Sequence, residues 1–534
     1  MRKTKIICTI GPATESLEML ENLANAGMNV ARLNMSHGNH ESHKKVIDSI
    51  KILNSRLNHP IAVLLDTQGP EIRTGDMAND LHLHEGDTIS IVARGAEDVE
   101  SSSIHVNYDD LINDVDIGDI ITVDNGLINL EVLSKQERIM QCKVIDGGLL
   151  KSRRHVNLPG IRVNLPAITE KDRRDIEFGM AQDVDFIALS FVRAAKDVEE
   201  LRELLGDKAD MIKIIAKLED QEAITNMVEI IAAADGVMVA RGDLGCEMDF
   251  WELPHAQRRI VRSCAQKGKR VIVATHLMES MIENPIPTRA EVTDVANAIY
   301  EEVDAVMLSG ETTIGKYPIR CVEQLVEIAR ASERVPGLSF VQKLTPDSDK
   351  QQIAHYAVQL AESIGAKGTV VITRRGYMAD FVTNCHPQKS RIYAFTNDSQ
   401  TRRRLVLNRN VSPYRIAFSQ DPEKILKEIQ KRAEAEVAKR ESKEKESSYL
   451  SKLHEVVNKE IGSDFKNING LIRALTKYAT PSVRDKMLTT SSSGRRKTVS
   501  MDKSIYDQIR SLLAQPNCNK AAIARESGVS VVQV

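Results

Sequence analysis

Short runs of Val, Ile, Leu and Ala recur along the first 320 residues, separated by longer amphipathic stretches. Continuously apolar runs of this length are typical of parallel strands buried on both faces, and the stretches between them are typical of crossover helices. Eight such strands are expected, at residues 5–11, 29–34, 62–67, 185–192, 213–219, 236–244, 271–276 and 305–311. Eight strands that alternate with helices predict an α/β fold, the (β/α)8 or TIM barrel.

The spacing between these strands is short except after Thr67, where more than 100 residues precede the fourth strand. We therefore expect the barrel to occupy residues 1–71 and 161–340. The inserted residues 72–160 alternate apolar with polar positions, which predicts a small antiparallel β-barrel domain that forms a lid over the barrel mouth. An α/β pattern restarts at 341–425 and predicts a C-terminal α/β domain.

The rest of the chain has a different composition. Between residues 421 and 447, 16 of 27 residues are charged and form i,i+4 pairs, which predicts a solvated helical linker at 426–447. Residues 448–534 carry 14 Lys and Arg against 7 Asp and Glu, and we interpret them as a basic helical extension. The segment 521–534 resembles the start of a helix-turn-helix but stops before a recognition helix. A role in assembly or solubility is therefore favoured over nucleic-acid binding, and 495–500 is interpreted as solvated linker.

Composition excludes several classes of protein. The chain has 534 residues, 42% of them hydrophobic, and no apolar run approaches the roughly 20 residues that a membrane span requires. Its seven Cys form no CxxC pair and no Cys/His cluster, so neither a disulfide framework nor a zinc site is supported. A cytoplasmic protein with reduced, mostly buried thiols is expected.

Polar residues gather where six of the predicted strands end, which is the end of a (β/α)8 barrel that carries the active site. Lys217 and Glu219 share one side of their strand because side chains alternate, and Asp243 follows the next strand. Two carboxylates at adjacent strand ends suit Mg²⁺ (or Mn²⁺), which prefers oxygen ligands. The alternative for Lys217 and Glu219 is a buried salt bridge without function.

A second oxygen-rich group could hold a monovalent cation; its members are Asn34, Ser36, Asp66 and Thr67. From spacing alone, hydrogen bonding in turns and helix caps explains these residues better. Arg32 and Arg73 near the barrel mouth have the fork geometry for phosphate, although surface salt bridges are equally compatible. Gly242 and Asp243 begin a short helix whose free N–H groups could hold an anion, a weak signal by itself.

Eight strings of residues occur in the order, and at about the spacings, found in pyruvate kinases. They are ICTIGPATES, NVARLNMSHG, LLDTQGPEIRTG, VNLPG, IIAKLED, GVMVARGDLG, MIENPIPTRAEVTDVANAI and DAVMLSGETTIGKYP. Over about residues 1–425 the chain resembles a bacterial-type pyruvate kinase, whose barrel, lid and C-terminal domain match the divisions above. The resemblance implies phosphoryl transfer from phosphoenolpyruvate to ADP, dependence on Mg²⁺ and K⁺, and a homotetramer.

The resemblance also implies a role for individual residues. Arg32 would contact the phosphate of phosphoenolpyruvate, Lys217 would neutralise the transferring phosphoryl group, and Thr275 would lie near the carbon that is protonated. The backbone of Gly242 and Asp243 would hold the substrate carboxylate. Mg²⁺ would be bound by Glu219 and Asp243, and K⁺ by Asn34, Ser36, Asp66 and Thr67. The nucleotide would be bound by Asn34, His37, Arg73 and Arg154.

Several positions depart from the family pattern. Gln68 stands where the family often has Lys, and Arg154 replaces the Lys that usually contacts the nucleotide. His276-Leu277-Met278 stands where Gln-Met-Leu is more usual. After about residue 425 the final strands and the effector loop of the C-terminal domain are missing, so regulation by a sugar phosphate is not expected. The sheet edge left exposed would be covered by the tail or by a neighbouring subunit.

The competing hypothesis is a regulatory protein that retains the pyruvate kinase fold with little or no activity. Its basic tail would bind nucleic acid, because an excess of Lys and Arg favours phosphate binding. A measurement of pyruvate formation would separate this hypothesis from the enzyme.

Overall fold

The structure is a computed structural model that describes residues 2–442, apart from 78, 94–102, 125, 137, 162, 164, 419, 420, 422 and 440. The chain divides into two compact units, Met1–Gln420 and Asp421–Val534. The predictions for residues 448–534, including the helix-turn-helix-like end, lie outside the described residues.

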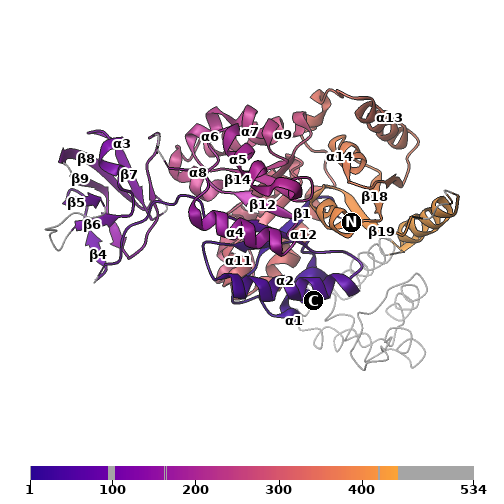
Figure 1. Cartoon of the computed structure of the whole chain (residues 1–534), viewed down its shortest axis with the longest axis horizontal. Coiled ribbons are helices and arrows are strands. Elements are labelled where there is room, and N and C mark those ends of the chain that lie inside the picture. The colour runs from indigo at the N-terminus through magenta and orange to yellow at the C-terminus, as the bar shows by residue number, and fades with distance from the viewer. Residues whose placement is uncertain are drawn as a thin grey trace, which may run out of the picture. The chain divides into compact units, whose positions relative to one another are not determined.

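The first unit is built around a closed barrel of eight parallel strands (Figure 1). Its strands are β1 (Lys5–Thr9), β2 (Val30–Asn34), β3 (Ala62–Asp66), β12 (Phe186–Leu189), β13 (Lys213–Leu218), β14 (Gly236–Ala240), β15 (Arg270–Ala274) and β16 (Ala305–Leu308). They follow one another around the barrel in chain order, and β16 pairs with β1. The predicted fold class is therefore confirmed.

The predicted strands were drawn one to four residues too long, and two of them run on into a helix. Beyond Ala240 the chain turns into helix α8 (Arg241–Glu247), and beyond Leu308 it turns into α11 (Gly310–Thr313). The apolar pattern continues through both turns because their residues remain buried, although the backbone is no longer extended. Asp243 consequently lies on a helix at the barrel mouth and not on a strand.

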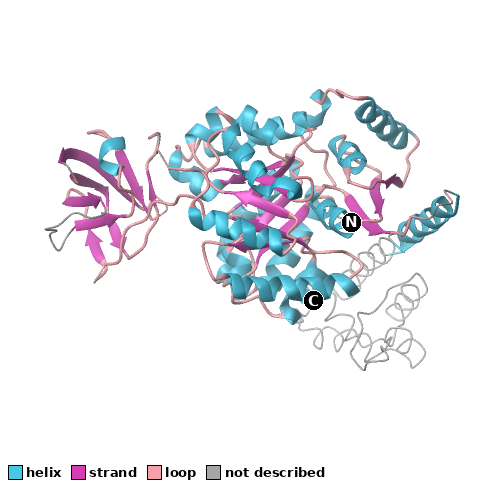
Figure 2. Ribbon diagram, viewed as in Figure 1, coloured by secondary structure: helices cyan, strands magenta, loops and turns pink. Residues whose placement is uncertain are grey.

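Helices surround the barrel (Figure 2). They are α1 (Leu17–Ala26), α2 (His40–Arg56), α4 (Glu170–Ala181), α5 (Ala195–Leu205), α6 (Gln221–Thr225), α7 (Met227–Ala233), α9 (Leu253–Lys267), α10 (Arg289–Tyr300) and α12 (Pro318–Ser332). One apolar core lies between strands and helices, and a second fills the barrel interior with residues such as Ile7, Leu64 and Met238. Every strand residue is thus buried on one side or the other, which explains the continuous apolar runs.

A helix cap helps to position the loop after β3. Thr169 and Asp172 form a capping box at the start of α4. Oδ1 of Asp172 also accepts hydrogen bonds from the backbone N–H groups of Gln68 and Gly69, at 3.0 and 3.1 Å. One buried carboxylate therefore ties the helix start to the segment that follows Asp66 and Thr67.

The inserted residues form a six-stranded and a two-stranded sheet in the part of the chain that the structure describes. The strands are β4 (Leu81–Leu83), β5 (Thr88–Ala93), β6 (Ser103–Val106), β7 (Ile120–Val123), β8 (Ile128–Gln136), β9 (Ile139–Asp146), β10 (Gly148–Leu150) and β11 (Val156–Asn157), with one short helix, α3 (Leu111–Asp114). Pairing is antiparallel as expected, except that β5 and β6 are parallel. This insertion is called the lid below.

The C-terminal domain contains the parallel sheet β17 (Gly368–Ile372), β18 (Arg391–Thr396) and β19 (Val411–Arg415). Its helices are α13 (Asp349–Ser363), α14 (Tyr377–Asn384) and α15 (Ser399–Arg404). Of these elements, α15 and β19 were not expected from the sequence. The turn that follows α15 places Val406 and Leu407 in the core inside the barrel, so this domain completes the barrel packing.

In the second unit, residues 423–439 are helical. Two of the i,i+4 pairs expected on this helix are present: Lys427 Nζ lies 4.0 Å from Glu423 Oε2, and Arg432 Nη2 lies 2.7 Å from Glu428 Oε1. Both pairs are largely exposed, and exposed ion pairs contribute little to stability. Their pattern is that of the solvated helix expected there.

Candidate active site

Lys217 lies at the centre of a buried polar cluster at the carboxyl ends of the strands. Its Nζ is 2.8 Å from Oε1 of Glu219 and 3.3 Å from Oδ1 of Asp66. Burial opposes the positive charge of Lys217, but the carboxylates of Asp66 and Glu219 outweigh it and hold the pKa of Lys217 above its ordinary value. An ammonium that stays protonated at neutral pH is suited to a developing negative charge.

Arg32 reaches the same cluster from β2. Its Nε donates to Oδ2 of Asp66 at 2.6 Å, and its Nη1 donates to Oγ1 of Thr9 at 3.0 Å. Burial works against ionisation of Asp66, but the charges of Arg32 and Lys217 keep the pKa of Asp66 below its usual range. The Asp66 carboxylate on β3 thus pairs with both Arg32 and Lys217, the two cations that the family resemblance assigned to the phosphoryl group.

Ser190 joins these groups and was missed in the sequence. Its Oγ accepts from Lys217 Nζ at 2.8 Å and donates to the carbonyl of Thr67 at 2.7 Å. The signal was available, because Ser190 directly follows β12, at the same end of the barrel as the other polar residues. A serine in the run ALSFV attracts less notice than a lysine or a carboxylate, because serine is common in turns.

The carboxyl groups of Glu219 and Asp243 interact with one another across adjacent elements. Oε2 of Glu219 accepts from the backbone N–H of Phe191 at 2.6 Å, which fixes its orientation. Burial raises the pKa of both carboxyls; the Asp243 carboxylate raises the pKa of Glu219 further, whereas a hydrogen bond with Glu219 lowers the pKa of Asp243. A buried carboxylate, Glu219, and a partly exposed one, Asp243, held together in this way form an arrangement that a divalent cation would stabilise.

These residues fit Mg²⁺ better than a metal that needs a full set of protein ligands. Within the described residues, no group of three or more His, Cys, Asp and Glu side chains could hold a metal ion. Mg²⁺ is commonly bound by one or two carboxylates together with water and substrate oxygens. The pair Glu219 and Asp243 supplies that number.

The four residues proposed for K⁺ lie on β2, β3 and the turns that follow. Asn34 pairs in register with Asp66, and Oδ1 of Asn34 accepts from the N–H of Ser36 at 3.2 Å. Thr67 accepts from the N–H of Ser190 at 3.0 Å through its Oγ1. The structure thus brings Asn34 and Asp66 side by side at neighbouring strand ends, while Asn34 and Thr67 also make turn hydrogen bonds of the kind considered as the alternative.

Thr275 and Gly242 are in direct contact. The N–H of Gly242 donates to Oγ1 of Thr275 at 2.6 Å, and this hydroxyl donates to the carbonyl of Ala274 at 2.7 Å. Thr275 and His276 both have positive φ, 65° and 51°, which is unfavourable for side chains with a Cβ. Such strained backbone concentrates at functional sites.

Arg241 supports this strained turn and was also missed. Its Nη2 donates to the carbonyl of Thr275 at 2.7 Å, while its Nη1 pairs with Asp294 at 2.7 Å.

By contrast, Glu311, which follows the eighth barrel strand, has a local structural role. Its two oxygens accept from the N–H groups of Met278 and Ser309.

The residues expected on the nucleotide side are less closely grouped. His37 is exposed in the loop after β2. Arg73 pairs with Glu71 at 2.7 Å, and Nη1 of Arg154 lies 3.3 Å from Oδ1 of Asp124 in the lid. Nε of Arg154 is buried, and no described residue supplies a hydrogen-bond acceptor for it. The sequence did not anticipate that His155, whose pKa burial lowers, would lie 3.9 Å from Asp243.

A (β/α)8 barrel with a lid, two buried cations and a pair of carboxylates at its carboxyl end defines a class of enzymes that act on anionic substrates. Comparison with known proteins identifies the family. The family profile described as "Pyruvate kinase, barrel domain" matches residues 1–322, and "Pyruvate kinase, alpha/beta domain" matches residues 351–458. The chain belongs to the pyruvate kinase family. The second match runs past residue 425, so the resemblance extends further than the sequence strings indicated.

Curated relatives agree with this assignment. Plastidial pyruvate kinase 2 of Arabidopsis thaliana is 45% identical over 431 residues, which cover 79% of this chain and 73% of the relative. Pyruvate kinase isozyme G, chloroplastic, of Nicotiana tabacum is 46% identical over 433 residues, 79% and 75% of the two chains. Pyruvate kinase of Staphylococcus epidermidis is 45% identical over 419 residues, 77% and 72%. Within the described residues, no helix has the length and apolar character to cross a bilayer.

Proposed function

We propose that the chain transfers the phosphoryl group of phosphoenolpyruvate to ADP and releases pyruvate and ATP. The observation that carries this proposal is the placement of two buried cations, Lys217 and Arg32, on the two oxygens of Asp66 at the carboxyl end of the barrel. Phosphoryl transfer depends on positioning and charge neutralisation more than on covalent catalysis by the protein. Because the chain belongs to the pyruvate kinase family, we infer that the anion bound here is a phosphoryl group.

Each residue of the site has a separate role in this reaction. Arg32 binds the phosphate of phosphoenolpyruvate, and Lys217 balances the charge on the phosphoryl oxygens while the bond from phosphorus to the enol oxygen breaks. A new bond forms between phosphorus and an oxygen of the β-phosphate of ADP. The enolate that remains takes up a proton at its terminal carbon, close to the Thr275 hydroxyl, and becomes pyruvate.

Glu219 and Asp243 are the residues that would hold Mg²⁺ (or Mn²⁺), which when bound lends positive charge to the phosphoryl oxygens and the substrate. Asn34, Ser36, Asp66 and Thr67 would hold K⁺. The N–H of Gly242 is already donated to Thr275, so a substrate carboxylate at Gly242 and Asp243 would replace the Thr275 hydroxyl as its acceptor. We assign His37, Arg73 and Arg154 to the nucleotide, together with Asn34.

A coupled assay of pyruvate formation on the purified full-length chain tests this function. With phosphoenolpyruvate, ADP, Mg²⁺ and K⁺ present, we expect turnover in the range of 1–100 s⁻¹ that is typical of kinases, and a large loss when either cation is omitted. Absence of turnover with both cations present would favour the regulatory hypothesis. The basic tail on which that hypothesis depends lies outside the described residues.

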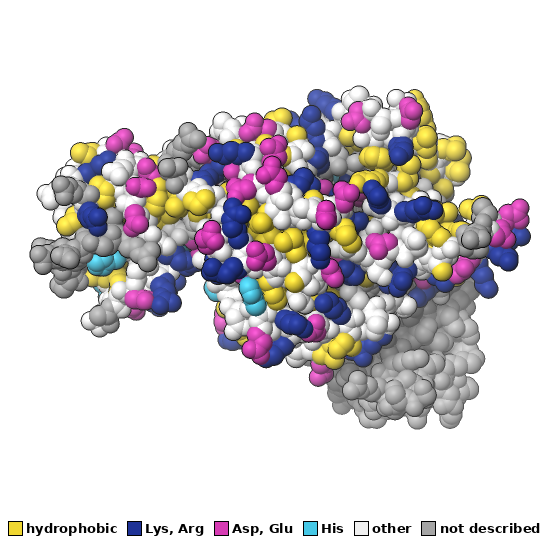
Figure 3. Space-filling model, in the orientation of Figure 1, with side chains coloured by type: hydrophobic (Ala, Val, Ile, Leu, Met, Phe, Trp, Pro, Cys, Tyr) yellow, Lys and Arg dark blue, Asp and Glu magenta, His cyan; other side chains and the backbone are white. Residues whose placement is uncertain are grey.

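Assembly into a homo-oligomer is also part of the proposal. Apolar side chains that are more than 40% exposed gather on α13 and the edge strand β17: Ile353, Tyr356, Leu360, Ile364, Val370 and Ile372. Figure 3 shows hydrophobic side chains collected over the C-terminal domain. Such a patch on a soluble domain marks an interaction surface. A tetramer, as the family resemblance implies, would bury it between subunits.

Deletion of residues 426–534 is expected to leave turnover per folded active site near normal, because every proposed site residue lies in the unit Met1–Gln420. We expect the oligomer size or the solubility to change, because the tail is a candidate to cover exposed apolar surface. Light scattering and the pyruvate assay on the shortened chain check both. A folded, soluble but inactive product would assign the tail to the catalytic unit and contradict the division of the chain.

A further inference from the structure

The turn after β12 contacts the chain that follows both neighbouring strands, β3 and β13. Its first residue, Ser190, is 1% exposed. On one side the N–H of Ser190 donates to Oγ1 of Thr67 at 3.0 Å, and on the other side its Oγ lies 2.8 Å from Nζ of Lys217. One buried serine therefore connects the segment after β3 to the lysine that we assign to phosphoryl transfer.

The hydrogen bonds of the Ser190 hydroxyl fix its direction. A hydroxyl has one hydrogen, and Ser190 donates it to the carbonyl of Thr67 at 2.7 Å, because the alternative acceptor, Oδ1 of Asp66, is 3.4 Å away. The lone pairs of the hydroxyl then face Lys217, which as an ammonium can only donate. Ser190 is thus a fixed acceptor for Nζ of Lys217.

The ammonium of Lys217 has two other acceptors, and both are carboxylates. Oε1 of Glu219 is 2.8 Å from Nζ, and Oδ1 of Asp66 is 3.3 Å from it. In the proposed function Glu219 also binds Mg²⁺ and Asp66 also binds K⁺, so a cation competes with the ammonium for each carboxylate. Ser190 is neutral and is assigned no cation, so its contact with Lys217 is the one that metal binding leaves unchanged.

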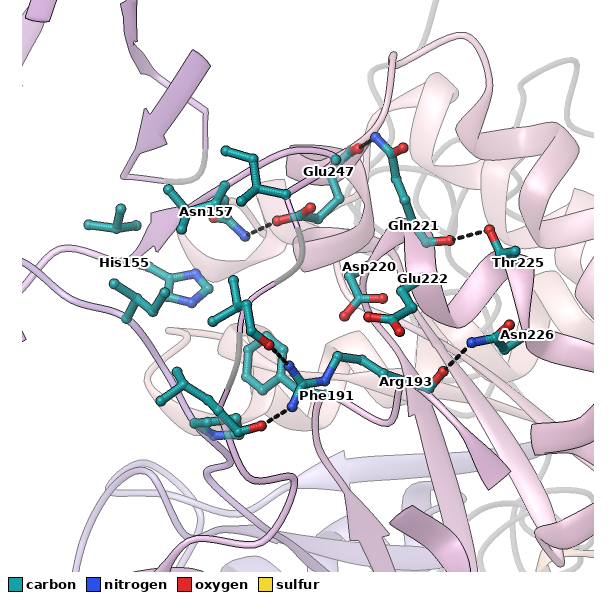
Figure 4. Close-up of a pocket in the computed structure, with 18 residues that line it drawn as sticks. His155, Asn157, Phe191, Arg193, Asp220, Gln221, Glu222, Thr225, Asn226 and Glu247 are labelled. Carbon is teal, nitrogen blue, oxygen red and sulfur yellow. Dashed lines mark hydrogen bonds between the residues drawn. The ribbon is translucent and has the colours of Figure 1, made fainter. Parts of the chain in front are cut away.

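The backbone of this turn is strained, which is typical of functional sites. Phe191 has a φ of 52°, a conformation that side chains with a Cβ adopt only where their surroundings hold them in it. Its N–H donates to Oε2 of Glu219 at 2.6 Å, and its ring lines the cavity drawn in Figure 4, 6.2 Å from the ring of His155. These contacts hold the turn in place, so Ser190 has a defined position relative to Lys217.

We propose that Ser190 is a positioning residue for phosphoryl transfer, whose hydroxyl holds the ammonium of Lys217 where charge develops on the phosphoryl oxygens. This inference rests on the proposed function. An ammonium that is already in position needs no reorganisation while the bond from phosphorus to the enol oxygen breaks. Its position therefore affects turnover more than it affects substrate binding.

Ser190→Ala in the full-length chain tests the proposal. Turnover should fall about 10- to 100-fold, the range that corresponds to loss of one hydrogen bond to a charged group. The affinity for phosphoenolpyruvate, measured by calorimetry, should change less than about threefold, as expected for an interaction made mainly in the transition state. Arg32, which we assign to the phosphate, keeps its contacts with Asp66 and Thr9.

Two further variants separate the hydrogen bond from packing. Ser190→Cys keeps nearly the same volume, but a thiol is a weak hydrogen-bonding group, so its turnover should be as low as that of Ser190→Ala. If Ser190→Ala does not fold, Ser190→Cys carries the same prediction. Ser390 is also 1% exposed, and its Oγ lies 3.2 Å from Oγ1 of Thr369 in the C-terminal domain, so Ser390→Ala is a matched control with near-normal turnover. Near-normal turnover in Ser190→Cys would show a packing role and contradict the proposal.

A double variant shows whether Ser190 acts through Lys217. In Lys217→Met no ammonium remains to be held, so adding Ser190→Ala should lower turnover by less than about a further twofold. Independent effects that multiply would contradict the proposal. Unchanged turnover in folded Ser190→Ala beside an active wild type would contradict it as well, without affecting the proposed function. An inactive wild type would contradict the proposed function, and this inference with it.

Discussion

Replacement of Lys217 by Met is expected to lower turnover by about a thousandfold while phosphoenolpyruvate still binds. Methionine keeps the length of the side chain and removes the charge that balances the phosphoryl oxygens as the bond to the enol oxygen breaks. Loss of a single preorganised group that stabilises charge in the transition state typically costs 10²–10³ in turnover. Binding should be retained because Arg32, which we propose contacts the phosphate, is unchanged. The pyruvate assay gives turnover, and calorimetry with phosphoenolpyruvate gives binding.

A matched control is available on the same strand. Lys213 begins β13, and its Nζ is 2.9 Å from Oδ1 of Asp235 at the opposite end of the barrel. Lys213→Met therefore repeats the chemical change and the loss of an ion pair away from the cluster, and we expect near-normal turnover. Thermal unfolding of both variants separates loss of chemistry from loss of fold. Near-normal turnover in folded Lys217→Met would mean that Lys217 has only a structural role, as part of a buried salt bridge.

Glu219→Gln and Asp243→Asn are expected to raise the Mg²⁺ concentration needed for half-maximal activity by tenfold or more. Each change removes one of two carboxylates, and even residues that only orient a metal ligand typically change metal affinity 10–100-fold. Direct titration with Mn²⁺, followed by electron paramagnetic resonance, measures the same loss without substrate turnover.

The control for the carboxylate variants is Glu247→Gln. Glu247 lies on the same helix as Asp243, but its Oε1 accepts a hydrogen bond from Nδ2 of Asn157 at 3.0 Å. Its metal titration should therefore match that of the wild type. If Glu219→Gln and Asp243→Asn also leave both metal titrations unchanged, these two residues are not the ligands.

The barrel and most of its site could be predicted because the signals are local. A strand buried on both faces must be apolar along its whole length, so all eight barrel strands were evident. Lys217 and Glu219 share a face because side chains alternate along a strand. Because the strands are parallel, their carboxyl ends all lie at the same end of the barrel. Recognising the strands was therefore enough to predict that Arg32, Asp66 and Lys217 gather at that end.

Other features depended on contacts between segments far apart in the sequence. Ser190 has meaning only beside Lys217 and Thr67, and Arg241 only beneath the strained turn at Thr275. The place of Val406 and Leu407 inside the barrel follows from how the C-terminal domain docks, because an apolar pair in a short turn does not specify which core receives it.

Periodicity and composition are properties of neighbouring residues, so they were enough to predict the fold class and the residue types at the strand ends, and the eight strings of residues indicated the family. Contacts between distant segments were needed to show which oxygen of Asp66 meets which cation, how Glu219 and Asp243 interact, and where a cavity remains. Packing of Asn157 against Glu247 of α8 leaves Oδ1 of Asn157 buried, with no hydrogen-bond partner among the described residues. The energy of such a group depends on atoms that distant parts of the chain bring, or fail to bring, within hydrogen-bonding distance.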